Sequence, residues 1–170
     1  LPPRKVTPSE EDLARIRREA ARIQAARARD SAEGWFLDGF RWPVRGRLTG
    51  VYGSQRILNG EPRAPHLGVD IAAPRGTPVH AAARGFVALA EADLFFTGGT
   101  VVLDHGHGVS TIYSHLDTLE VSAGVVVEQG QRLGTVGSTG RSTGPHLDWR
   151  VNWFQVRLDP VLVAGPMPED

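Results

Sequence analysis

The chain has 170 residues, of which 41% are hydrophobic and 22% are charged, and its formal net charge is zero. This length allows a substantial core, and the composition is that of an ordinary globular protein. Without an excess of Lys and Arg, the composition argues against a nucleic acid or an anionic membrane as the partner. Cysteine is absent, which excludes disulfides and thiolate metal sites. No run approaches the ~18 apolar residues of a membrane span.

The first 34 residues have the pattern of a helical extension. Thr7-Pro8-Ser9-Glu10 fits a capping box, with Pro8 in the first helical position and Glu10 reaching back to Thr7. A narrow apolar stripe follows, at Leu13, Ile16, Ala20 and Ile23. Arginines cover much of the remaining surface, and we interpret them as a solvated face, since acidic residues offset most of their charge. The chain begins at Leu1 without a signal peptide, so we expect that a leader is missing.

Residues 35–170 are predicted to form a mainly β domain. From Trp42 onward the helical period disappears, and strand-like runs alternate with glycine-rich turns, which is typical of a β-sandwich or barrel. These runs are 47–52, 78–91, 99–104, 109–115, 124–127, 132–136 and 146–153. Residues 78–90 and 124–136 share a pattern that suggests a duplicated β motif of the barrel-sandwich hybrid kind. Lipoyl carrier domains share this pattern but need a hairpin lysine, and the only lysine is Lys5.

Two pairs of side chains have spacings that favour a metal site. His146 and Asp148 would point into one site if residues 146–153 form a strand, because side chains two apart on a strand face the same way. His66 and Asp70 can converge in a similar way if their segment is extended. Such spacings alone are weak evidence for a metal site. Each pair also lies beside Gly and Pro, which strengthens this interpretation.

These pairs belong to a longer series of motifs that resembles a known family. The blocks are His66-x-x-x-Asp70, Tyr113-Ser114-His115-Leu116, and residues 138–149 with the sequence STGRSTGPHLDW. In this order they look like the motifs of the lysostaphin/LytM-type zinc metallopeptidases, which cut peptidoglycan cross-links. Supporting similarity extends over residues 40–163. The family ends its last motif His-x-His, whereas this chain has Asp148 at the second position.

The resemblance implies a set of site residues and an activity. Zn²⁺ would be held by His66, Asp70 and Asp148, with an open position for water, as in catalytic rather than structural zinc sites. His115 and His146 match the non-ligand histidines that transfer protons. Tyr113 and Arg56 are expected to contact the substrate. The implied function is hydrolysis of peptide cross-links in peptidoglycan stems, in the periplasmic or extracellular part of the cell envelope.

The exchange of His for Asp148 keeps a second interpretation open. Two carboxylates and one imidazole bring the formal charge of zinc and ligands to zero, which weakens the Lewis acid. The alternative is therefore a catalytically weak or inactive peptidoglycan-binding domain that activates another cell-wall hydrolase. A phosphotransfer domain with paired histidines is a third possibility, but Asp70 and Asp148 would repel phosphate.

The remaining histidines are interpreted as structural. His105 and His107 belong to a glycine-rich hairpin and are predicted to be surface turn residues. His80 lies within a strand-like run and is predicted to be packed and hydrogen-bonded.

Overall fold

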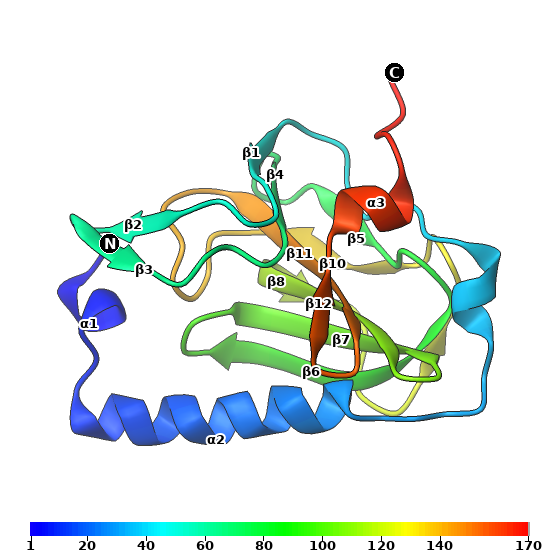
Figure 1. The fold of residues 1–170 in the computed structure, drawn as a ribbon, viewed down its shortest axis with the longest axis horizontal. Coiled ribbons are helices and arrows are strands. Elements are labelled where there is room, and N and C mark those ends of the chain that lie inside the picture. Colours follow the sequence, from blue (N-terminus) through cyan, green and yellow to red (C-terminus); the bar gives the residue numbers. More distant parts are fainter. Residues whose placement is uncertain (170) are drawn as a thin grey trace.

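The computed structural model describes residues 1–169 and consists mainly of β-strands (Figure 1). It contains a 10-stranded sheet, a separate two-stranded hairpin and helices near both ends of the chain. The helices are α1 (Pro3–Val6), α2 (Glu10–Arg27), the 3-10 helix η1 (Trp35–Asp38) and α3 (Pro160–Ala164). The mainly β prediction is confirmed. Asp170, the last residue of the predicted 35–170 domain, lies outside the described residues.

The strands of the large sheet pair in antiparallel fashion in the order β1-β4-β11-β8-β7-β6-β9, while β10 pairs with β5 and β8, and β12 pairs with β11. Their bounds are β1 Leu48–Gly50, β4 Val69–Ala72, β5 Pro78–His80, β6 Gly85–Leu94, β7 Gly98–Gly106, β8 Val109–Leu119, β9 Val126–Val127, β10 Arg132–Val136, β11 His146–Trp153 and β12 Val156–Leu158. The separate hairpin is formed by β2 (Arg56–Leu58) and β3 (Glu61–Arg63).

The strand β8 is the branch point of the sheet. Its first half pairs with β11, from Val109 to Ser114, whereas its second half pairs with β10, from Leu116 onward. His115 lies between the two halves and has a φ of 64°. This left-handed conformation is strained for a residue with a side chain, and such strain is concentrated at functional sites.

The main core lies on one face of β4, β8 and β11. Along β11, Leu147, Trp149 and Val151 belong to this core, as the two-residue period of a strand requires. Trp149 is fully buried and packs against Trp42, with ring centroids 5.5 Å apart. The intervening residues of β11 therefore point to the opposite face, and they include Asp148 and Arg150.

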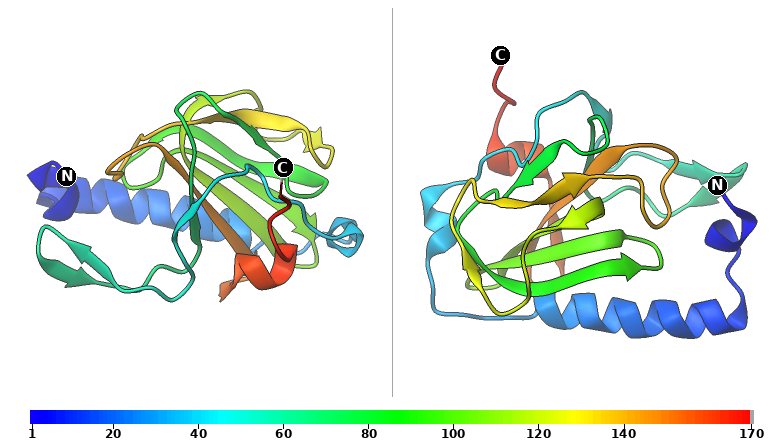
Figure 2. Two further views of the ribbon diagram at one scale, coloured as in Figure 1. Left: turned by 90° about the horizontal axis from the view of Figure 1, so that it is seen from above. Right: turned by 180° about the vertical axis from the view of Figure 1, so that it is seen from behind.

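The helix α2 lies along the β6–β7 side of the sheet (Figures 1 and 2). Its N-cap is Ser9, which forms a capping box with Asp12. The observed N-cap is therefore two residues later than Thr7, the predicted N-cap. The cap moves because Ser9 and Asp12 satisfy two free backbone donors reciprocally.

The arginine face of α2 is not simply solvated, which corrects the interpretation of its charge pattern. Arg22 of α2 forms an ion pair with Glu91, and Arg29, which follows the helix, forms one with Asp104. Leu13, part of the predicted apolar stripe, is 38% exposed. Polar contacts thus hold much of the extension on the sheet, and the boundary at residue 34 stays a prediction. No helix within residues 1–169 is both long and apolar enough to cross a membrane.

Candidate metal and catalytic site

A cavity of about 610 Å³ opens on the face of the sheet opposite the main core. Its floor comes from β4, β8 and β11, and its walls from the β2–β3 hairpin and the N-terminal segment, including Leu1 and Ile23. Contacts tie these walls together: Arg63 of β3 donates to the Val6 carbonyl at 3.3 Å, and Lys5 donates to the Phe95 carbonyl at 2.6 Å. The extension therefore forms one side of the cavity.

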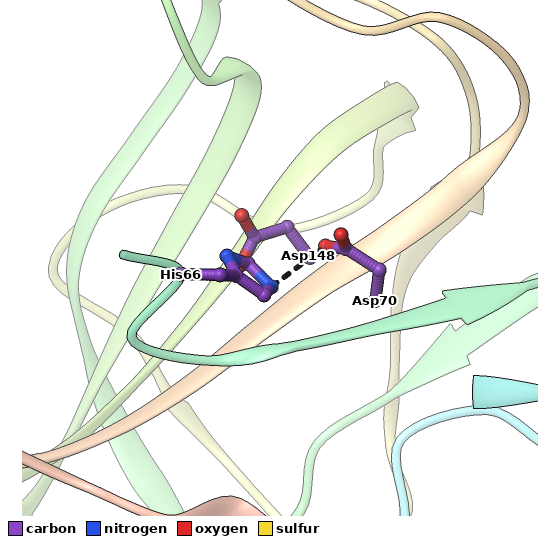
Figure 3. Close-up of side chains that lie close together, drawn as sticks. All are labelled: His66, Asp70 and Asp148. Carbon is purple, nitrogen blue, oxygen red and sulfur yellow. Dashed lines mark ion pairs between the residues drawn. The ribbon is translucent and has the colours of Figure 1, made fainter. Parts of the chain in front are cut away.

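The predicted metal ligands meet in this cavity (Figure 3). Asp70 of β4 and Asp148 of β11 are directly opposite each other in the sheet, and His66 comes from the loop that enters β4. One donor atom from each of the three lies within 4.8 Å of the others. The loop passes close to β11 because Gly68 has no side chain: a Cβ there would lie 2.6 Å from Cγ of Arg150 and 3.2 Å from an Asp148 oxygen.

Two of these candidate metal-ligand atoms have no hydrogen-bond partner. His66 is 1% exposed, and its Nε2 lies 3.0 Å from Oδ1 of Asp70, yet both atoms are buried without a hydrogen bond. Buried polar atoms are nearly always satisfied, so such a pair calls for an explanation. Imidazole nitrogen and carboxylate oxygen are donors that zinc prefers. The pair therefore fits a metal cation.

Asp148 is embedded in positive charge. Arg150 donates from Nε to Oδ1 at 3.0 Å and from Nη2 to Oδ2 at 3.1 Å, and Nη2 of Arg56 lies 3.6 Å from Oδ2. Burial alone would raise the pKa of the Asp148 carboxyl, but the Arg150 guanidinium outweighs it and holds that pKa well below its usual range. Asp148 is therefore ionised, and since a carboxylate has about four acceptor positions, a metal can still approach it.

His115 and His146 form a second group beside the first. Their ring centroids are 4.8 Å apart, and Nε2 of His146 lies 3.6 Å from Oδ1 of Asp70. Nδ1 of His115 donates to the Thr139 carbonyl at 2.7 Å, and Nδ1 of His146 donates to the Gly144 carbonyl at 2.8 Å. A carbonyl can only accept, so the proton of each neutral ring is fixed on Nδ1. Nε2 is then left with a free lone pair, as a general base requires.

Burial also affects the proton affinity of His115. It lowers the pKa of the ring, with the charge of Asp148 opposing the shift. His115 is therefore neutral at neutral pH, in the form that accepts a proton.

Tyr113 does not lie in this cavity, so its predicted contact with substrate is wrong. It is fully buried, and its hydroxyl accepts from the Ala82 backbone and lies 3.0 Å from the Thr111 hydroxyl. The prediction assumed that Tyr113 and His115 share a face because they are two residues apart. The positive φ of His115 interrupts this alternation, and the cavity is lined by Ile112, Ser114 and His115 instead.

Arg56 does lie in the cavity, where it contacts the predicted ligands. Besides approaching Asp148, its Nη2 is 2.5 Å from Nδ1 of His66. Sequence reasoning missed Arg150, although its position two residues after Asp148 places both on the same face of β11. It also missed the backbone carbonyls that orient the two histidines, for which the sequence carries no signal.

The structure corrects two of the remaining histidines. His105 is fully buried rather than a surface turn residue, because β7 extends to Gly106 and carries it into the interior. Its Nδ1 donates to the Arg84 carbonyl at 2.6 Å, and its Nε2 is 2.8 Å from the Thr111 hydroxyl. His107 is exposed in the turn as predicted, whereas His80 is exposed rather than packed.

Comparison with known proteins agrees with this geometry. The chain is 43% identical over 104 residues to the DD-carboxypeptidase/endopeptidase Mpg of Neisseria meningitidis serogroup B, covering 61% of this chain and 24% of that protein. It is 39% identical over 114 residues to the peptidoglycan DD-endopeptidase ShyA of Vibrio cholerae, covering 65% of this chain and 26% of that protein. The chain thus spans about a quarter of the length of these curated relatives.

Solved structures give the same assignment. A Pseudomonas aeruginosa structure described as a peptidase M23 superposes with a TM-score of 0.80 at 41% identity, covering 92% of this chain and 63% of that one. A zinc-containing peptidase from Vibrio cholerae superposes with a TM-score of 0.67 at 30% identity, covering 76% of this chain and 41% of that one. Residues 64–160, which include both groups of site residues, match Peptidase family M23. The resemblance predicted from the motifs is confirmed, and the chain belongs to peptidase family M23.

Proposed function

We propose that this chain is a zinc-dependent endopeptidase that hydrolyses the peptide cross-links of peptidoglycan. The observation that carries the proposal is the buried, unpartnered pair of His66 Nε2 and Asp70 Oδ1, which face each other beside two histidines with free Nε2 atoms. One group offers ligands for a cation, and the other offers proton acceptors within the same cavity. This combination suits metal-assisted hydrolysis.

In this proposal the ligands are His66, Asp70 and Asp148. A zinc ion held by them would supply a Lewis acid and lower the pKa of a bound water molecule. Asp148 contributes negative charge, and Arg150 offsets part of it, which reduces the electrostatic cost of having Asp rather than His at this position. The expected weakening of the Lewis acid is therefore smaller than the ligand charges alone imply.

His115 and His146 would manage the protons of the reaction. Each ring is held by a carbonyl at Nδ1 and presents Nε2 toward the cavity, so it can take a proton from an attacking water. The protonated ring can then return that proton to the leaving amine. Because both carbonyls are fixed by the backbone, the rings keep the orientation needed for this transfer.

The substrate class is supported by the names of relatives and by the charge of the cavity. The curated relatives include a peptidoglycan DD-endopeptidase. The cavity is lined by five arginines but by only two carboxylates. This excess of positive charge favours a peptide that carries carboxylates. The arginines are Arg56, Arg63, Arg141, Arg150 and Arg157. Peptidoglycan stems are peptides of this kind, and their location assigns the chain to the cell envelope.

A second candidate, a peptidoglycan-binding domain of low activity that activates another wall hydrolase, is favoured by the position of Arg56. A guanidinium only donates, so Nδ1 of His66 accepts from Arg56 and neutral His66 then carries its proton on Nε2. Coordination through Nε2 requires that Arg56 leave Nδ1. If Arg56 stays, the metal site is closed and the cavity serves for binding only.

Digestion of purified sacculi separates the two candidates. The protein is tested after removal of metal with a chelator, and again after addition of zinc. The proposal predicts new peptide termini in the chromatogram of the zinc-restored sample and none in the metal-free sample. Binding to sacculi without new termini at any pH from 5 to 9, in protein that contains zinc, would favour the binding domain.

A further inference from the structure

The last turn of α2 carries a buried arginine that the proposed reaction does not use. Arg27 is 8% exposed, and its Nε and Nη2 atoms are buried with no acceptor among residues 1–169. A buried charge without a partner is strongly unfavourable, and proteins rarely retain one without a use. Burial lowers the pKa of Arg27, and the charge of Arg150 lowers it further by a smaller amount.

Two further arginines lie near this guanidinium, at the hairpin formed by β11 and β12. Gln155, in the turn of this hairpin, donates to the Gln24 carbonyl at 3.3 Å and so holds the hairpin against α2. Arg157 of β12 donates to the Asn152 side chain at 2.6 Å. The other arginine is Arg150, which lies two residues before Asn152 on β11. We call Arg27, Arg150 and Arg157 the arginine corner.

The arginine corner has an excess of positive charge. The charge of Asp148 acts on both Arg150 and Arg157, and both oxygens of Asp148 are already bonded to Arg150. Burial is the main cause that lowers the pKa of Arg157 to about 9, and the charges of Arg27 and Arg150 contribute less. The Asn152 side chain, which accepts from Arg157, is neutral. The three guanidinium groups therefore outnumber Asp148 and Asp70, the two carboxylates that act on Arg150, and the excess positive charge is partly desolvated.

The geometry points to an anion-binding site at the arginine corner, which takes a carboxylate of the peptide substrate. Guanidinium groups bind carboxylates through two parallel hydrogen bonds, and Arg27 offers two free nitrogens for such a contact. Arg150 and Arg157 line the cavity that holds His66, His115 and Asp148, whereas Arg27 is not among its lining residues. An extended peptide bound beside Asp148 would bring an acidic group to Arg150 and Arg157, whose charges act on Arg27.

This inference rests on the proposed function for its substrate, and it gives α2 a role. The helix supplies Arg27, so the N-terminal extension would contribute a specificity-determining residue rather than only a wall. A phosphate group has similar bonding chemistry, but the charged groups of a peptide stem that match a guanidinium are carboxylates. Inorganic phosphate is therefore the comparison ligand in the test.

The first test compares Arg27→Met with Arg18→Met, a variant of an exposed arginine on the same helix. The substrates are muropeptide dimers with free carboxyl groups and the same dimers after carboxyl amidation. We expect Arg27→Met to raise KM for the free-acid dimer about tenfold or more, as loss of a charge-assisted hydrogen bond implies. KM for the amidated dimer, kcat and zinc content should stay unchanged, and Arg18→Met should match the wild type. An equal effect on both substrates, or no effect, would overturn the inference.

A second test does not depend on turnover. Calorimetry on zinc-depleted protein measures binding of the two dimers and of inorganic phosphate. The inference requires that the free acid binds better than the amide, and that Arg27→Met abolishes the difference. Preference for phosphate with no difference between the dimers would contradict it. If the wild type hydrolyses nothing, the proposed function fails, but this measurement still decides the anion site.

Thermal unfolding provides a check against misfolding. Methionine keeps the length of the arginine stem and removes an uncompensated charge, so Arg27→Met should unfold at a higher temperature than the wild type in buffer without multivalent anions. Arg18→Met should not. A lower unfolding temperature for Arg27→Met would mean that the guanidinium is satisfied within the protein, and the anion site would be wrong.

Discussion

His66 and His105 are both buried histidines, yet they differ in how their ring nitrogens are satisfied. His105, at the end of β7, bonds through Nδ1 to the Arg84 carbonyl and through Nε2 to the Thr111 hydroxyl. His66, in the cavity, has Arg56 at Nδ1 and an unpartnered Nε2 that faces an unpartnered oxygen of Asp70. His105 needs nothing beyond the protein, whereas we propose that a cation completes His66.

The difference shows that burial alone does not separate structural from functional histidines. Burial lowers the pKa of both His105 and His115, so both are neutral at neutral pH. What separates them is the free nitrogen: His115 keeps Nε2 available in the cavity, and His105 does not. Unsatisfied donors and acceptors are costly, so a cluster of them in one cavity is a candidate for the place where a ligand or substrate acts.

The largest expected effect follows from removing the unsatisfied histidine. His66→Ala should lose nearly all of its zinc and its hydrolysis of sacculi, because one of three proposed ligands is absent. The matched change, His105→Ala, should keep zinc at the wild-type level and instead lower the free energy of unfolding by about 2 to 4 kcal/mol, since it leaves a cavity and unpaired groups. Elemental analysis and denaturant unfolding measure both quantities. Full zinc occupancy in His66→Ala would contradict the assignment of His66 as a ligand.

A smaller effect is expected at the histidines with free Nε2 atoms. His115→Ala and His146→Ala should each lower kcat by about 10²- to 10⁴-fold, the range typical of general acid–base catalysis, with zinc retained. Separate measurements of metal content and turnover check this prediction. Loss of zinc in either variant would mean that the ring is a ligand and that the division into two groups is wrong.

The sequence predicted the family, the mainly β fold and the residues that gather in the cavity, because these depend on motifs and on short-range periodicity. It failed for Tyr113 and His105, where a single positive φ at His115 and the greater length of β7 decide which side chain points inward. It also did not predict the arginine corner. That cluster joins α2 to the β11–β12 hairpin, and no local pattern indicates contacts between segments so far apart.

The pH dependence of stability offers a further test of the satisfied histidine. Burial, opposed by the bond to the Arg84 carbonyl, lowers the pKa of His105 to about 4 from its ordinary value of 6.5. Between these values the unfolded chain binds a proton that the folded chain does not, so stability falls as pH drops from about 6.5 to about 4. The loss should reach about 3 kcal/mol.

The His105→Gln variant isolates this contribution. Its stability should depend less on pH in that window than the stability of wild type, whereas His80→Gln, a change at an exposed histidine, should leave the dependence unaltered. Urea unfolding at several pH values measures both. A wild-type pH dependence in His105→Gln would show that another group is responsible.

The smallest effect is expected for Tyr113→Phe. This change removes the hydroxyl that accepts from Ala82 and contacts the Thr111 hydroxyl, so it should lower the free energy of unfolding by about 1 kcal/mol. Because the hydroxyl lies in the core, kcat/KM should stay within about twofold of the wild type. A large fall in kcat/KM with unchanged stability would return Tyr113 to the active site.

The most direct test of the metal assignment is an anomalous diffraction map, recorded at the zinc absorption edge from crystals of zinc-loaded protein. We predict one strong peak about 2.0 to 2.2 Å from Nε2 of His66 and from oxygens of Asp70 and Asp148, with Arg56 moved away from Nδ1 of His66. A peak at His105 or His107, or no peak while Arg56 remains on His66, would contradict the assignment.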